Sequence, residues 1–280
     1  MQSHILFKPM KFLWQAVHAL DGVLRGEATH PSALQDGKLG LPLRGLTVLI
    51  VLLGVFYGFC MGWFAIFNRE SPEYAQLVAS MVKVPALFFL TLLVTLPSLY
   101  VFNALVGSRL HGPTLLQLLV ASLGVTLAVL ASFGPIVAFF SVTTTNYPFM
   151  VLLHVAVFTV AGLLGLGFLR QTMHRLSVYL IQAPAPAATP PAEAQAEGAA
   201  PASAARPPGA LDRVPSSGVV GGKVKFVFVC WIAVFGLVGA QMSWVLRPFI
   251  GSPTQPFEWF RHRESSFFEA VGRALVGLFS

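Results

Sequence analysis

Charged side chains are scarce in this chain, and their scarcity excludes an ordinary water-soluble protein. Of its 280 residues only 10% are Asp, Glu, Lys or Arg, whereas 55% are hydrophobic. A soluble globular domain carries about 25% charged residues. Because so few charges cannot cover the surface of a soluble protein of this size, we predict that much of the chain contacts lipid.

Cysteine and the common enzyme motifs are also scarce or missing. Two cysteines are too few for a disulfide-rich secreted scaffold. The sequence has no Walker A loop and no zinc-ligand spacing, so we predict neither a cofactor nor a metal. The net charge of +7 comes from basic residues beside apolar runs, where anionic lipid headgroups account for it. We therefore expect the lipid bilayer, and no nucleic acid, as a partner.

Long apolar runs, in contrast, are abundant. Five of them reach the roughly 20 residues that a membrane-spanning helix requires, and none contains Asp, Glu, Lys or Arg. The runs cover residues 46–67, 84–106, 114–142, 148–169 and 226–246. The predicted fold is therefore all-α: a polytopic membrane protein built as a bundle of five transmembrane helices with amphipathic flanking helices.

The segments around these runs divide the chain into four parts. We predict a cytoplasmic amphipathic N-terminal region (1–43), a four-helix transmembrane region (44–175), a mostly disordered, Ala/Pro-rich cytoplasmic linker (176–224), and a fifth transmembrane helix with a C-terminal interfacial segment (225–280). With the N-terminus inside, twelve Lys and Arg lie inside and six outside, Lys83 among the six. The positive-inside rule then predicts a cytoplasmic N-terminus and an external C-terminus. We expect the protein in the cell membrane, in bacteria the inner one.

Two flanking segments have helical amphipathic patterns. Between residues 10 and 25, apolar and polar side chains separate onto two helix faces. This helix either lies on the cytoplasmic leaflet or packs against the inner face of the bundle. The pattern resumes between residues 257 and 279, which predicts a second interfacial helix on the opposite leaflet.

Small residues and prolines mark candidate packing and hinge positions. Gly54, Gly58 and Gly62 recur every four residues, a spacing that lets two helix backbones approach closely. The stripe packs against another helix of the same bundle, the interpretation we favour, or forms a face between two copies of the chain. Pro135 interrupts the third run and is a candidate hinge, although static kinks are commoner in membrane bundles.

Polar residues in two of the runs form a candidate outer cluster. His154 is the one Asp, Glu, Lys, Arg or His within any run, and such residues are functional candidates in membranes. Gln241, Ser243 and Arg247 are expected at a similar depth on the fifth helix. Arg247 either caps the end of that helix or binds an anion, namely a lipid phosphate or the carboxylate of a partner.

Three stretches carry a resemblance to a known group: VPALFFLTLLVTLPSLYVFNALVG, SFGPIVAFFSVTTTNYPFMVLLHV, and VGAQMSWVLRPFIGSP with PFEWFRHRESSFFEAV. They resemble uncharacterised bacterial multi-span membrane proteins, some of which carry an actin-binding WH2 label. This chain has no segment that matches such a motif. Its layout is also loosely similar to that of Yip1-type membrane proteins. The resemblance implies a multi-span membrane protein and assigns no functional residue.

The absence of charge inside the runs shapes the functional prediction. Ion-coupled transporters usually carry ionisable residues in their spans, and a hydrolase needs more than one histidine. We therefore predict a non-enzymatic membrane scaffold, accessory or assembly subunit, with a protein partner or a second copy of the chain. The alternative is a transporter or channel subunit for an apolar or lipid-like substrate. A cavity in the bundle favours that alternative, and a solidly packed bundle favours the scaffold.

Overall fold

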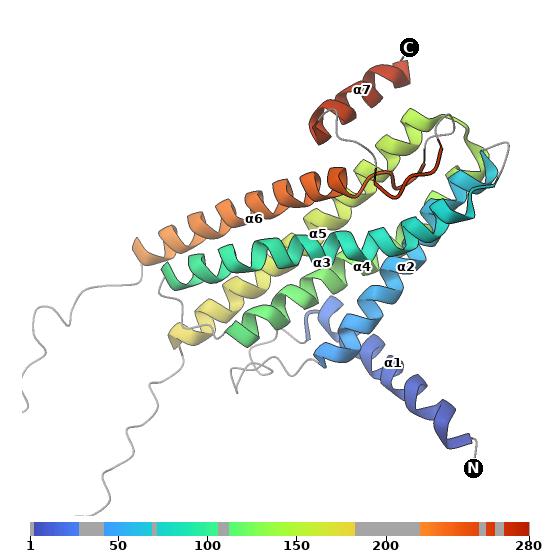
Figure 1. Cartoon of the computed structure of the whole chain (residues 1–280). Helices are drawn as coiled ribbons and strands as arrows, with labels where there is room; N and C mark the ends of the chain where they lie inside the picture. Colours follow the sequence, from blue (N-terminus) through green and yellow to red (C-terminus); the bar gives the residue numbers. More distant parts are fainter. Residues whose placement is uncertain are drawn as a thin grey trace, which may run out of the picture.

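In the computed structural model, the described part of the chain is all-helical (Figure 1). It comprises residues 3–27, 42–68, 72–105, 112–182, 219–251, 256–260 and 266–279. Within these ranges lie seven helices: α1 (Ser3–Leu24), α2 (Leu43–Phe67), α3 (Tyr74–Leu105), α4 (Gly112–Thr143), α5 (Tyr147–Gln182), α6 (Val219–Val245) and α7 (Phe267–Phe279).

Four of these helices, α2 to α5, are long and apolar enough to cross a membrane. The predicted all-α membrane fold is confirmed to that extent. The fifth apolar run lies in α6, whose described apolar part, Val229–Val245, is shorter than the four others. Of the predicted linker (176–224), residues 176–182 belong to α5 and residues 219–224 to α6, so its predicted ends are wrong. Residues 183–218 lie outside the described residues.

The helices form an elongated bundle with α1 at one end and α7 at the other (Figure 1). Helix α2 packs against α3 and α4, α4 packs against α5, and α6 lies along α3. Fully buried Tyr57 and Phe64 of α2, Leu127 of α4 and Met150 of α5 contribute to the core between these helices. Helix α7 contacts the ends of α5 and α6.

The glycine stripe of α2 faces α3 of the same chain. A Cβ atom built on Gly58 would lie 2.5 Å from the carbonyl oxygen of Ser80, and one on Gly62 would lie 2.9 Å from the Cα of Leu77. At Gly54 the nearest atom, 3.1 Å away, belongs to Pro85. These glycines are buried, so the stripe lets the α2 and α3 backbones approach closely within one bundle.

Helix α4 continues through Pro135, which is exposed. The neighbouring Gly134 faces α2, where a Cβ would lie 3.0 Å from a ring carbon of Phe56. The hinge at Pro135 stays a prediction.

Helix α1 presents one face to the bundle and another away from it. Ala16, Leu20 and Val23 are buried against α2 and α4, whereas Trp14 and Val17 are 66% and 50% exposed. The structure thus supports packing of this helix against the bundle, and its position on the cytoplasmic leaflet stays a prediction for the exposed apolar side chains.

Two predicted boundaries are wrong. The second apolar run was predicted to start after Lys83, but α3 begins at Tyr74 and contains this lysine. The candidate span within α3 is Tyr74–Ser98, so one predicted charge-free span contains a charge. The C-terminal helix begins at Phe267, ten residues later than predicted, and residues 257–260 are not helical.

Candidate binding groove

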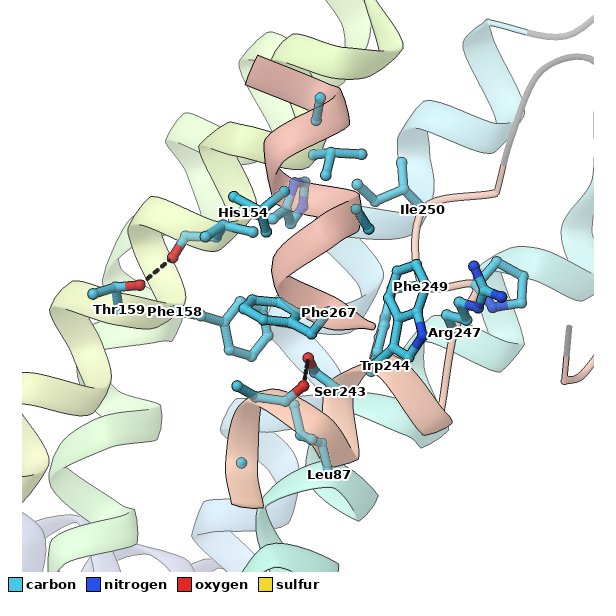
Figure 2. A pocket seen from close by; sticks show the side chains of 18 of the residues that line it. Leu87, His154, Phe158, Thr159, Ser243, Trp244, Arg247, Phe249, Ile250 and Phe267 are labelled. Atoms are coloured by element: carbon cyan, nitrogen blue, oxygen red, sulfur yellow. Dashed lines mark hydrogen bonds between the residues drawn. The ribbon is translucent and has the colours of Figure 1, made fainter. Parts of the chain in front are cut away.

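A large groove opens between α5 and α6. Its volume is about 1080 Å³, and α3 supplies its floor through Leu87, Phe88 and Thr91. Helix α6 lies along α3 and hardly touches α5, which leaves the space between them. The turn after α6 and the first half of α7 border one end of the groove, which we call the α7 end (Figure 2).

Two glycines, which have no side chain, help to keep the groove open. Gly162 of α5 and Gly236 of α6 both line it, and a Cβ atom on either would meet nothing within 4 Å. The walls around them are apolar, with Phe158 and Leu166 on α5 and Phe235 on α6. A smaller cavity of about 30 Å³ shares Phe235 and Gly162 and continues toward α4. The groove is therefore suited to an apolar occupant.

The predicted outer cluster is only partly assembled. His154, Ser243 and Arg247 all line the groove, whereas Gln241 is exposed on α6 and does not. Figure 2 shows His154 on α5 and Ser243 on α6 on different sides of the groove. Ser243 donates a hydrogen bond to the Ala240 carbonyl of its own helix (2.7 Å). The cluster thus consists of separate polar points on a largely apolar surface.

The hydrogen bond of His154 defines its tautomer. Its Nδ1 lies 2.7 Å from the Met150 carbonyl oxygen, and because a carbonyl only accepts, Nδ1 carries the proton. In the neutral ring, Nε2 is then an acceptor. The His154 ring meets that of Tyr57 edge-on, with centroids 6.2 Å apart. Among the described residues, neither His154 Nε2 nor the Tyr57 hydroxyl has a hydrogen-bond partner.

Charged side chains line the groove at its α7 end. The guanidinium carbon of Arg247 lies over the Trp244 ring, 3.8 Å from the ring centroid. Arg273 of α7 and Glu258 line the same end. Arg273 also makes an exposed ion pair with Glu269 at 3.8 Å. The groove therefore combines an apolar length with a polar end that carries charges of both signs.

A group of polar residues on α3, which we call the α3 clasp, holds the turn after α6. Gln76, Ser80 and Lys83 share one helix face, and each is at most 2% exposed. Gln76 Nε2 donates to the carbonyls of Pro248 (3.2 Å) and Phe249 (2.7 Å), and the Ser80 hydroxyl also donates to Phe249. These bonds fix the backbone immediately after Arg247.

Lys83 is the charged member of the α3 clasp. Its ammonium group donates to the Pro248 carbonyl (2.9 Å) and to the Trp259 carbonyl. It also lies 5.9 Å from the Trp259 ring centroid and 5.4 Å from that of Phe260. The sequence prediction does not identify Lys83, because it places this residue in a loop before the second apolar run, whereas α3 contains it. The available signal was the spacing of Gln76, Ser80 and Lys83, which puts three polar side chains on one helix face.

Within the described ranges, no three His, Cys, Asp or Glu side chains come together as a metal site. No protein-family model, curated protein or solved structure matches the chain.

Proposed function

We propose that this protein binds a lipid-like amphiphile in the groove between α5 and α6 and acts without catalysing a reaction. The observation that carries this proposal is a cavity of about 1080 Å³ with apolar walls and charges at its α7 end. Small-molecule pockets usually measure about 300–1,000 Å³. A volume at the top of that range suits a molecule with long apolar chains and one polar end.

Along α6 the groove is about as long as one leaflet of a bilayer is thick, whereas on α5 its lining runs from Tyr147 to Leu166. Phe235 and Val245 are ten residues apart on α6, which corresponds to about 15 Å at roughly 1.5 Å per residue. The hydrocarbon core of a bilayer is about 30 Å thick, so each leaflet contributes about half of that. The apolar chains of an amphiphile whose polar end lies at the α7 end would therefore reach along α6 to about the middle of the membrane.

We further propose that α6 is a fifth membrane span, with the N-terminus cytoplasmic and the α7 end outside, in the inner cell membrane. Helix α6 has 27 residues, enough for about 40 Å at roughly 1.5 Å per residue. The excess of Lys and Arg on the N-terminal side supports this orientation. The groove would then receive lipids of the outer leaflet, between two lipid-facing helices.

The groove also bears on the choice between the two functions predicted from the sequence. A scaffold or assembly subunit that holds no ligand needs a tightly packed bundle, and α5 and α6 leave a cavity instead. We therefore favour the alternative, a carrier or transport subunit for a lipid-like molecule. The groove has few polar atoms along its length, which suits a substrate that needs no buried charge.

Filling the groove tests the proposal. Phenylalanine at Gly162 or Gly236 should occupy space that the apolar chains would use, while the helices themselves keep their contacts. We expect Gly162→Phe and Gly236→Phe to lose most of the lipid that co-purifies with the parent protein in mild detergent. The measurement is lipid per mole of protein, by extraction and mass spectrometry.

Gly167 provides the matched control. It lies on α5, is exposed, has nothing within 4 Å of a built Cβ, and does not line the groove. Gly167→Phe should therefore retain the parent's lipid content. Equal lipid content in all three variants and the parent, with all of them folded, would contradict binding in the groove.

A further inference from the structure

The end of the groove opposite the α7 end, which we call the deep end, borders the smaller cavity of about 30 Å³. Four residues line both spaces: Phe88, Gly162, Leu166 and Phe235. These residues therefore lie at the boundary between the groove and the small cavity. Because glycine contributes no side chain, the partition between the two spaces consists of Phe88, Leu166 and Phe235.

Phe235 is the member of this partition that comes from α6. All other residues around the small cavity belong to α3, α4 and α5, so the Phe235 ring reaches across from α6 to close the space between those helices. One helical turn away on α6 lies Trp231, which is fully buried, and the two ring centroids are 5.4 Å apart. The Phe235 ring thus rests against a buried neighbour, which limits its movement.

The α3 side of the partition is held in a similar way. The Phe88 ring stacks on that of Phe158, with centroids 5.9 Å apart and planes inclined by 10°. Phe158 in turn meets the ring of the fully buried Tyr57 edge-on at 5.5 Å. A chain that reaches the deep end therefore meets rings that are fixed by the core. A close-packed wall of this kind does not yield to additional methylene groups without a cost in free energy.

The small cavity behind the partition is suited to an apolar chain. On α5 its lining reaches Leu169, three residues past Leu166, which is about 4.5 Å at roughly 1.5 Å per residue. Its two hydroxyl groups already have acceptors: Ser122 donates to the Gly165 carbonyl (2.8 Å) and Thr126 to that of Ser122 (3.0 Å). An apolar chain could therefore enter this cavity without depriving a hydroxyl group of its hydrogen bond.

We propose that Phe235 determines how long an apolar chain the groove accepts, because the end of the chain stops against its ring. This inference rests on the proposed function, since it specifies the chain length of the same ligand. Chains that just fill the groove bind best, whereas a longer chain has to press against the partition or leave its end outside. Removing the Phe235 ring joins the groove to the small cavity and makes room for a longer chain.

The test is a competition among ligands that differ only in chain length. Protein freed of native lipid by detergent exchange is incubated with an equimolar mixture of saturated lysophosphatidylcholines, the even-numbered members from decanoyl to eicosanoyl. The bound species are quantified by native mass spectrometry. We expect the parent to prefer one chain length and to bind the next longer chain at least about fivefold more weakly. In Phe235→Ala the preferred length should move to a longer member of the series.

Phe226 provides the matched control, because it is a phenylalanine on the same helix that is exposed and lines neither cavity. Phe226→Ala should keep the preferred chain length of the parent. Phe235→Leu is the second variant and serves if Phe235→Ala does not fold. It keeps an apolar side chain beside Trp231 but lacks the ring, so its preferred length should also move to longer chains.

The possible failures have different meanings. Equal binding of all chain lengths by the parent, or the parent's preferred length in the folded Phe235 variants, would overturn the role of Phe235 and leave binding in the groove standing. A shift of the same size in Phe226→Ala would overturn that role as well. Failure of every chain length to bind the folded parent would remove both proposals together.

Discussion

At the scale of single residues, Lys83 links α3 to the segment that follows α6. Its ammonium group reaches the carbonyl of Pro248, 165 positions away, and that of Trp259, 176 positions away. A lysine within a span is costly unless its charge meets polar atoms. Two carbonyls and two aromatic rings supply them here, so the residue that breaks a charge-free run also fixes the groove's α7 end.

Replacing Lys83 should loosen that end. Lys83→Met keeps the length of the side chain but removes the donors to Pro248 and Trp259. We expect a loss of about 1–3 kcal/mol in stability, because buried carbonyls lose their partner. Because Gln76 still donates to the Pro248 carbonyl, we expect a loss at the lower end of this range. The measurement is thermal unfolding together with hydrogen exchange in residues 247–251 and 256–260.

The exposed Lys11 of α1 is the control for this change. Lys11→Met should leave both measurements as in the parent. If the 247–251 backbone of Lys83→Met exchanged no faster than in the parent, the α3 clasp would not depend on the lysine.

The sequence identified part of the candidate site and missed the part made by distant contacts. His154, Ser243 and Arg247 were predicted because polar residues stand out in apolar runs, and all three line the groove. Gln241 is also a polar residue within an apolar run, but it is exposed and does not line the groove. Its position along α6 places it on another helix face from Ser243. The groove itself could not be predicted, because it depends on the separation of α5 and α6.

At the scale of elements, glycine has three different roles in these helices. Gly58 permits close contact between α2 and α3, Gly162 leaves space in the groove, and Gly167 is exposed on α5. Gly165, between the latter two, packs against Thr126 of α4. The sequence shows the spacing of glycines, but only the position of the neighbouring helix decides which of them tolerates a side chain.

Alanine substitutions should separate these roles. In Gly58→Ala the new methyl group would meet backbone atoms of Ser80 and Met81 within 2.7 Å, so α2 and α3 must separate. We expect a loss of about 1–3 kcal/mol. Gly167→Ala meets nothing and should gain up to about 1 kcal/mol from helix propensity. The measurement is thermal unfolding of both variants in the same detergent. Equal changes in stability for Gly58→Ala and Gly167→Ala would contradict close packing at Gly58.

The sequence predicts the position of a helix well where the helix has to be apolar in order to cross lipid. The runs predicted at 114–142 and 148–169 lie within α4 and α5, because a span needs an uninterrupted apolar stretch. The start of α3 was missed because its first two turns are polar on the face that binds the turn after α6. The start of α7 was predicted too early because the aromatic residues Phe257, Trp259 and Phe260 extend the apolar pattern of the helix although residues 257–260 are not helical.

At the scale of the whole molecule, the two ends of the bundle are chemically different. Helix α1 adds exposed apolar side chains at one end, while the α3 clasp, Arg247 and α7 form the other. The groove opens along the half of α6 nearer α7. Such one-sidedness means that the orientation in the membrane decides which leaflet can supply the proposed ligand.

The last prediction concerns that orientation and the number of spans together. Single cysteines at Gln15 of α1 and at Ser266, both exposed, would be introduced after replacing Cys60 and Cys230 by alanine. In intact cells that express the protein, a membrane-impermeant thiol reagent should label Ser266→Cys and should label Gln15→Cys only after permeabilisation. This result requires an odd number of crossings, hence α6 as a fifth span. The opposite pattern would invert the bundle and place the α7 end of the groove in the cytoplasmic leaflet. Labelling of both sites in intact cells, or of neither, would mean an even number of crossings, in which case α6 does not span the membrane and the groove faces the bilayer surface.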